Sequence, residues 1–305
     1  MKFNATLFAL FLGVLAFAPS SFAVDTLEVF ALRVQFQEEK TDNSLTTGTG
    51  VFDSDKKEKD AYSLDPPGRR GTASYWLKHF EFANNYFNAV SGGKLVVKAR
   101  IFPDPSTGSS VYTLDKYIID YNRTSKKKGE KTAEFDDARS RDYLTFVYDA
   151  IAAAAKDSSE AGPFRIPLSD NPNVKRAYMI IHAGASRLVD GGSMGTKGAD
   201  TPADFMDVYI DGESWEYLLP DSAKAKTAEA IREKRDAGDS VVTTGIYIPN
   251  GKVDTLRSVM VMSETASQDG LNWGVNGILV NQIAREIGLP NTYDVVKGIS
   301  RLGYT

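Results

Sequence analysis

Apolar residues recur at intervals of three or four in several segments, the spacing that gives an α-helix one apolar face. This spacing predicts helices over residues 74–90, 137–156 and 272–287, and a more polar stretch predicts an exposed helix over 223–236. Ser74 is placed to cap the first helix, and a pair of glycines ends it. The apolar face of that helix would consist of Trp76, Phe80, Ala83, Phe87 and Val90.

Short apolar runs bounded by polar residues predict buried β-strands. Residues 32–36 alternate between apolar and polar positions, which indicates a strand buried on one face only. The segments 37–72 and 103–134 are polar and irregular, and 184–201 is rich in glycine. Further strands are expected at residues 95–102, 177–182, 205–210, 241–248 and 256–261. Helices and strands thus alternate irregularly around one core, which favours a single domain of the α/β or α+β class.

The N-terminus has the pattern of a secretory signal peptide. Lys2 precedes an apolar run over residues 7–17, and small residues precede the expected cleavage site after Ala23. The alternative is an N-terminal membrane anchor, but the run is short for a bilayer span, which needs about 20 apolar residues. We therefore expect a signal peptide over 1–23 and a domain over 24–305 that is secreted, periplasmic or in the cell envelope, without membrane contact after cleavage.

Composition narrows the class of protein further. The chain has no cysteine, so an exported form would be stabilised by its core or by bound ions rather than by disulfides. Its formal net charge is −4, whereas a nucleic-acid-binding domain is usually basic. The sequence therefore argues against a nucleic-acid partner.

The predicted helix near the C-terminus carries the most informative pattern. Zinc peptidases of the zincin type carry H-E-x-x-H on a helix, where two histidines bind zinc and the glutamate acts as general base. In this chain Asn281 and Arg285 stand at the two histidine positions and Gln282 at the glutamate position. Asn291 stands where an extended motif, H-E-x-x-H-x-x-G-x-x-D, has its third ligand, and Gly288 keeps the glycine of that motif.

Four further segments match one family in the same order along the chain. They are residues 86–95, 180–185, 263–270 and 276–280, which read YFNAVSGGKL, IIHAGA, SETASQDG and NGILV. With the helix motif, they resemble the immune-inhibitor-A family of secreted bacterial zinc metallopeptidases. The resemblance spans residues 74 to 303 and implies a zincin fold, a mixed sheet packed by helices. It also implies that the domain continues beyond Thr305, so we expect the chain to be incomplete at its C-terminal side.

The residues at the zinc positions cannot perform the family's chemistry. Amide side chains are poor zinc ligands, and a permanently cationic arginine repels a metal. Gln282 cannot accept a proton from water, so the general base is missing as well. We therefore expect neither catalytic residues nor zinc, with Asn281, Gln282 and Arg285 lining a cleft. The opposite face, Leu279, Ile283 and Ile287, would be buried. The alternative is a plain amphipathic helix that ends at Gly288.

Three other residues are candidates for a site in that cleft. His182 is the last residue of a predicted strand, where it would either face a ligand or be a hydrogen-bonded structural histidine. Glu264 and Asp269 lie between a strand and the motif helix, where they would cap the helix, bind structural calcium or form a carboxylate pair. Capping is the interpretation we favour. His79 is expected to be structural, since it lies beside the aromatic residues of the first helix.

Three functions follow from these observations. The first is an exported, inactive metallopeptidase homologue, a pseudopeptidase that binds a peptide or a secreted or cell-surface protein. The second is an active zinc peptidase of the same family with an unconventional site. The third is a structural module of a longer cell-surface protein.

Overall fold

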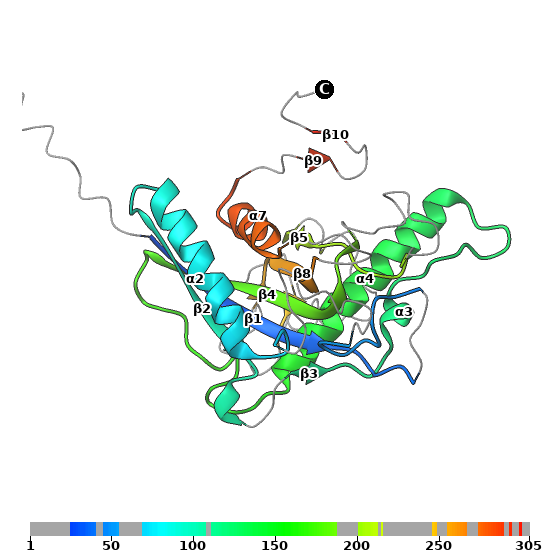
Figure 1. Ribbon diagram of the computed structural model, residues 1–305, viewed down its shortest axis with the longest axis horizontal. Helices are drawn as coiled ribbons and strands as arrows, with labels where there is room; N and C mark the ends of the chain where they lie inside the picture. The colour runs from blue at the N-terminus through cyan, green and yellow to red at the C-terminus, as the bar shows by residue number, and fades with distance from the viewer. Residues whose placement is uncertain are drawn as a thin grey trace, which may run out of the picture.

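Six strands form the central sheet of the protein, and helices cover both of its faces (Figure 1). The strand order is β2-β1-β4-β8-β5, and β3 pairs with β1 beside this path. All pairings are parallel except that of β5 with β8. The computed structural model describes residues 25–40, 45–54, 69–107, 111–187, 201–212, 215, 246–248, 255–266, 274–289, 293–294 and 299–300.

The strands of this sheet are β1 (Asp25–Gln35), β2 (Leu95–Phe102), β3 (Tyr112–Thr113), β4 (Val174–Ala185), β5 (Val208–Ile210) and β8 (Val259–Thr265). Two antiparallel pairs lie outside it, β6 (Ile246–Tyr247) with β7 (Thr255–Leu256) and β9 (Tyr293–Asp294) with β10 (Ile299–Ser300). The helices are α2 (Ala73–Val90), α3 (Ile118–Tyr121), α4 (Thr132–Ala155) and α7 (Asn276–Glu286), with a 3-10 turn at Pro105–Thr107. The expected mixed sheet packed by helices is thus confirmed.

The order of the strands explains why α2 and α4 cover different faces. β2 and β4 flank β1 on opposite sides, so the connections β1–α2–β2 and β2–α4–β4 run across the sheet in opposite directions. Right-handed crossovers that run in opposite directions place their helices on opposite faces. Accordingly, alternate residues of β1 pack on different helices: Val29 and Ala31 lie in the core under α2 and α7, and Phe30 and Leu32 in the core under α4.

β1 is buried on both faces, so the expectation of a half-buried strand is wrong. It lies in the middle of the sheet between β2 and β4, and even its polar residue Arg33 is only 2% exposed. The guanidinium of Arg33 donates to the carbonyl oxygens of Gly71 (2.6 Å) and Pro103 (3.0 Å). These bonds make its burial tolerable, although desolvation lowers the pKa of Arg33 to about 10.

Helix α2 matches the helix predicted over residues 74–90, with two corrections. Trp76, Phe80, Ala83 and Phe87 are buried, but Val90 is 64% exposed because it is the last helical residue. The cap is Thr72, whose side chain accepts from the backbone N–H of Tyr75, rather than Ser74. His79 is structural as expected, since its Nδ1 donates to Oδ1 of Asn276 (2.7 Å) and joins α2 to the start of α7.

Several predicted segments differ in their bounds. The strand expected at 256–261 is divided into β7 and β8, the one at 205–210 is only β5, and the irregular segment 103–134 contains β3 and α3. The predicted helix 223–236 lies outside the described residues, as do Asn291 and Asp269.

Candidate functional site

α7 carries the segment that resembles a zinc-peptidase motif, and it packs between α2, β5 and β8 on one face of the sheet (Figure 1). Its apolar residues Leu279 and Ile283 are fully buried, as predicted. Ile287 is 40% exposed instead, because the helix ends at Glu286 and the chain turns away through Gly288 at a φ of +95°. Left-handed backbone of this kind favours glycine, which accounts for the end of the helix.

The three motif positions on α7 point in different directions. Asn281 is exposed and Arg285 is half-buried, with its guanidinium 5.3 Å from the ring centre of Tyr209 on β5. Gln282 is only 2% exposed, so the expectation that it lines an open cleft is wrong. At about 100° per residue, Gln282 is closer on the helix surface to the buried Leu279 than to Asn281, which explains its burial.

Gln282 is also poorly satisfied. Within the described part of the chain, its Oε1 accepts no hydrogen bond although it is buried. An unsatisfied buried carbonyl costs roughly 1–3 kcal/mol. The residues at the motif positions therefore do not fit zinc: the inward-facing group is a neutral amide, and one helical turn later stands the cation of Arg285.

Glu286, the last residue of α7, ties the helix to the neighbouring strands. Its carboxylate accepts from the hydroxyl of Ser258 (2.9 Å), and burial raises the pKa of Glu286. Burial and the nearby charge of Glu286 raise the pKa of Tyr209 as well. Tyr209 on β5 thus interacts with two residues of α7, through its ring with Arg285 and electrostatically with Glu286. These interactions connect β5 to α7.

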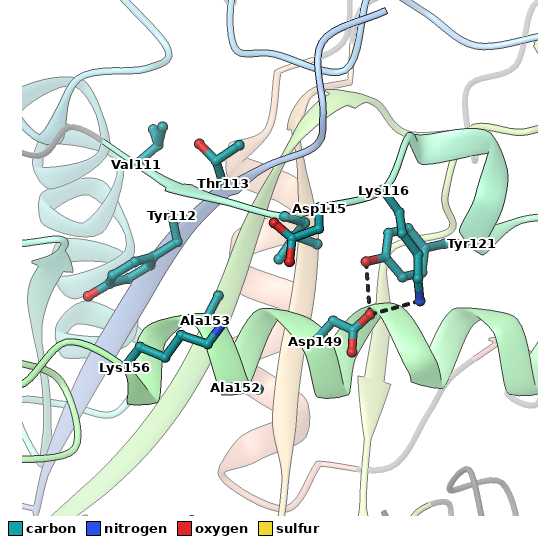
Figure 2. A pocket seen from close by; sticks show the side chains of 11 residues that line it. Val111, Tyr112, Thr113, Asp115, Lys116, Tyr121, Asp149, Ala152, Ala153 and Lys156 are labelled. Atoms are coloured by element: carbon teal, nitrogen blue, oxygen red, sulfur yellow. Dashed lines mark hydrogen bonds and ion pairs between the residues drawn. The ribbon is translucent and has the colours of Figure 1, made fainter. Parts of the chain in front are cut away.

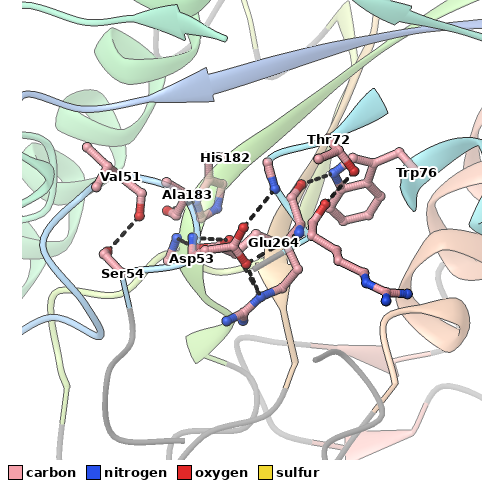
Figure 3. A network of polar contacts seen from close by, with 12 residues as sticks. Val51, Asp53, Ser54, Thr72, Trp76, His182, Ala183 and Glu264 are labelled. Atoms are coloured by element: carbon pink, nitrogen blue, oxygen red, sulfur yellow. Dashed lines mark hydrogen bonds and ion pairs between the residues drawn. The ribbon is translucent and has the colours of Figure 1, made fainter. Parts of the chain in front are cut away.

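Glu264 lies in the interior, where it connects three segments (Figure 3). Its side chain is 1% exposed, with Oε1 accepting from the N–H of Gly184 (2.9 Å) and Oε2 from the N–H of Asp53 (3.0 Å). The buried Arg70 lies 3.8 Å from Oε2 and donates to the carboxylate of Asp53 (3.0 Å). Glu264 therefore does not cap α7, contrary to the interpretation favoured from sequence, and instead anchors the loops that hold Asp53 and Arg70.

His182 is fully buried at the end of β4 and belongs to a second polar cluster. Its Nδ1 lies 2.8 Å from the carbonyl oxygen of Ala183 and its Nε2 lies 3.3 Å from the hydroxyl of Ser263. That hydroxyl lies 3.1 Å from Oδ1 of Asp207, which also accepts from the N–H of Ser263 (2.7 Å). Ser186 donates a very short hydrogen bond to the other oxygen of Asp207. Of the two interpretations of His182, the structure favours the hydrogen-bonded structural one.

Burial changes the acidity of both groups in this cluster. Desolvation lowers the pKa of His182 to about 4, and desolvation raises the pKa of Asp207 to about 6. The structure thus brings His182 close to Asp207 and Ser263. Sequence reasoning missed Asp207, because an aspartate before a short strand carries no distinguishing pattern.

An open pocket of about 480 Å³ lies between β3 and α4 (Figure 2). Within it, Asp149 accepts from the hydroxyl of Tyr121 (2.9 Å) and from the ammonium group of Lys116 (3.1 Å). Lys116 also lies 4.8 Å from the ring centre of Tyr121. These three polar groups satisfy one another, so they are not free to bind a ligand. Its lining residues are Val111, Tyr112, Thr113, Leu114, Asp115, Lys116, Tyr121, Asp149, Ala152, Ala153 and Lys156.

Comparisons with known proteins add no identification. No protein-family model matches this chain, and no curated protein matches it. Within the described residues, no helix is both long and apolar enough to cross a membrane. No group of three or more His, Asp or Glu side chains is placed to hold a metal ion in that same part of the chain.

Proposed function

We propose that the protein is an exported, zincin-like pseudopeptidase related to the immune-inhibitor-A family, which binds extended peptides or protein segments without hydrolysing them. The observation that carries the proposal is the placement of α7. The helix with the altered motif follows the last parallel strand β8 and packs beside the antiparallel strand β5. A zincin-like protein that had lost its zinc would keep this helix as part of the core.

β5 supports the binding part of the proposal. It pairs with β8 alone among the described residues, so its other edge has backbone groups that can pair with a further strand. An extended peptide can bind such an edge by strand addition, with backbone hydrogen bonds for affinity and side-chain contacts for specificity. The nearby side chains of Arg285 and Tyr209 would favour a peptide with acidic and aromatic residues.

Hydrogen exchange tests this proposal within one molecule. Adding a pool of acidic, aromatic-rich extended peptides should slow exchange of the backbone amides of Val208–Ile210. The strand β2 at the other edge of the sheet provides the control, and its amides over Leu95–Phe102 should not change. Equal protection at both edges would indicate non-specific association and would contradict the proposal.

Two measurements separate the alternatives. Stoichiometric zinc together with chelator-sensitive peptide cleavage would establish an active peptidase with an unconventional site. Absence of both zinc and peptide protection would instead favour the structural module of a longer cell-surface protein.

A further inference from the structure

The buried cluster of His182, Ser263 and Asp207 has a proton requirement that follows from its geometry alone. Three contacts run in series, from the carbonyl oxygen of Ala183 to His182, from His182 to Ser263, and from Ser263 to Asp207. Each contact needs one hydrogen atom between its two heavy atoms. The carbonyl oxygen at one end can only accept, and so can an ionised carboxylate at the other.

Counting the hydrogens shows which protonation state fits. A neutral imidazole and the serine hydroxyl supply only two hydrogens for three contacts if Asp207 is ionised, so one contact is left without a hydrogen. One additional proton, on either His182 or Asp207, completes all three contacts. A second additional proton would place two hydrogens in one contact. The geometry therefore fits one additional proton.

The surroundings of the cluster favour the same state. The ring of His182 lies among Phe36, Phe146 and Phe205, whose ring centres are 6.2, 5.6 and 5.2 Å away. Both His182 and Asp207 are buried, at 0% and 9% exposure. A net charge is costly in such apolar surroundings, and only the state with one additional proton is neutral overall.

Hydrogen bonds from Ser186 and Ser263 act against this preference by favouring the ionised carboxylate, but desolvation outweighs them, and no neighbouring charge among the described residues adds to them. Tyr143 of α4 donates to the carbonyl oxygen of Met206 (2.8 Å), and burial with the charge of Asp207 raises the pKa of Tyr143, so this group stays neutral. The carboxylates of Glu264 on β8 and Asp204 accept from backbone N–H groups elsewhere. Among the residues that the structure describes, no lysine or arginine forms an ion pair with Asp207.

The proton can reside on either of two groups. An ion pair of imidazolium and carboxylate would require two buried charges that Ser263 keeps apart, and each charge would lose its hydration. A carboxylic acid with a neutral imidazole requires no buried charge. In that arrangement Nδ1 of His182 donates to Ala183, Ser263 donates to Nε2, and Asp207 donates to Ser263.

We propose that Asp207 and His182 form one proton-binding site, in which the carboxyl group holds the proton and the imidazole stays neutral. Loss of the proton would then leave a buried carboxylate where β4, β5 and β8 meet. Asp207 directly precedes β5 and bonds the backbone of Ser263 in β8, so it continues the pairing of these two strands. The protonated site would therefore stabilise the pairing of β5 with β8, and loss of the proton would weaken this pairing. This inference does not depend on the proposed peptide-binding function.

Nuclear magnetic resonance of the wild-type chain tests where the proton resides. The sequence has only two histidines, so ¹⁵N-labelled histidine gives two imidazole signals, and His79→Gln identifies the one from His182. At about pH 5, between the two pKa values, we expect His182 to be neutral with hydrogen on Nδ1. Infrared spectra at that pH should show a protonated-carboxyl band that Asp207→Asn removes. An imidazolium signal from His182, or an ionised Asp207, would overturn the proposal.

Hydrogen exchange tests the effect on β5. Asparagine is uncharged at every pH, as a protonated Asp207 is, and its carbonyl oxygen can keep accepting from the backbone N–H of Ser263, so Asp207→Asn should stabilise β5 at every pH. At about pH 8, amides of Val208–Ile210 should exchange up to roughly a hundredfold more slowly in this variant than in the wild type, and at about pH 3.5, below the ordinary aspartate pKa of 3.8, the difference should nearly vanish. The exposed substitution Asp170→Asn is the matched control and should change neither. Equal exchange rates of these amides in the wild type and Asp207→Asn at both pH values would contradict the proposed stabilisation of β5.

Discussion

At the residue scale, Glu264 holds together segments that are far apart in the sequence. Its two oxygens accept from the backbone of Gly184 and Asp53. Glu264→Gln exchanges one of these acceptors for an NH₂ group, which cannot accept, so a buried N–H loses its partner. We expect a loss of roughly 1–3 kcal/mol in the free energy of unfolding, measured by urea denaturation. The exposed substitution Glu160→Gln should have no measurable effect, and equal stability of both variants would show that the network is dispensable.

His182 and Asp207 should affect stability in opposite directions as pH changes. The folded pKa of His182 is below its usual value, so its contribution is present above about pH 6.5 and is lost as pH falls through about 4. The folded pKa of Asp207 is raised, so its contribution is present below its usual value of 3.8 and is lost as pH rises through about 6. The two effects nearly cancel in the wild type.

Single substitutions should reveal each effect. Asp207→Asn leaves His182 alone, so the variant should lose roughly 3 kcal/mol of unfolding free energy between about pH 6.5 and 4. His182→Gln leaves Asp207 alone, so this variant should gain a similar amount between about pH 6 and 4. Urea denaturation at a series of pH values measures both slopes. Slopes of the same sign in the two variants would show that these residues do not govern the acid response.

The sequence indicated His182 and Glu264 as candidates but did not indicate their environments. Burial of a polar side chain depends on long-range packing, and the partners of Glu264 are 80 and 211 positions away. Asp207 was missed for the same reason, because its partners are distant in sequence: Ser263 on β8 and Ser186 just after β4. The local sequence pattern could single out these titratable residues. Their burial could be seen only from the order of the strands in the sheet.

At the element scale, the two apolar positions of α7 should dominate its stability. Leu279 and Ile283 are fully buried in the core beneath α2 and β8. Leu279→Ala or Ile283→Ala should each cost about 2–5 kcal/mol, whereas Asn281→His on the exposed face should cost almost nothing. Thermal melting of the three variants makes the comparison. Strong destabilisation by Asn281→His, with no effect of the truncations, would show that the helix is oriented differently.

Gln282 provides a sharper test of the same helix. Gln282→Met removes a buried carbonyl oxygen that has no partner within the described residues, so it should be neutral or slightly stabilising. Gln282→Glu introduces the glutamate that zinc peptidases use as general base but buries a carboxylate, which should cost roughly 2–5 kcal/mol at neutral pH and less in acid. Denaturation at two pH values separates the pair. A well-tolerated Gln282→Glu would indicate that this side chain reaches solvent.

Element bounds were predictable where local signals were strong. The strand over Leu95–Phe102 matches its predicted range, because glycines precede it and a proline follows it. β1 was underestimated because an arginine interrupted its apolar run, although both terminal nitrogens of Arg33 donate to carbonyl oxygens, those of Gly71 and Pro103. Periodicity cannot distinguish such a buried cation from an exposed one.

At the scale of the whole molecule, the arrangement of strands could not be derived from local pattern. Alternating helices and strands predicted the α/β or α+β class, and the structure has a mixed sheet with helices on both faces. The antiparallel strand β5 has only three residues and carries no signal of its direction. Its pairing with β8 nevertheless creates the sheet edge on which the proposed peptide binding depends.

Export is a property of the whole chain that the proposed function requires. Lys2, the apolar run over 7–17 and the small residues before Val24 predict cleavage after Ala23. N-terminal sequencing of material secreted by an expressing bacterium should therefore begin at Val24. Ala23→Asp, which removes the small residue from the cleavage site, should leave the precursor uncut. Recovery of intact Met1 in a soluble cytoplasmic form would contradict the prediction.

Metal content decides between a binding protein and an enzyme. The helix α7 offers an exposed amide at Asn281, a buried amide at Gln282 and a cation at Arg285, none of which is a good zinc ligand. We expect mass spectrometry of the purified mature chain to find less than one equivalent of zinc and no chelator-sensitive cleavage of peptides. Structural calcium bound elsewhere would be compatible with this result.

Asn281→His with Arg285→His places two imidazoles one helical turn apart and should bring weak zinc affinity without hydrolysis, since Gln282 still cannot act as a base. Tightly bound stoichiometric zinc in the wild type, with cleavage that a chelator abolishes, would refute the assignment as a pseudopeptidase.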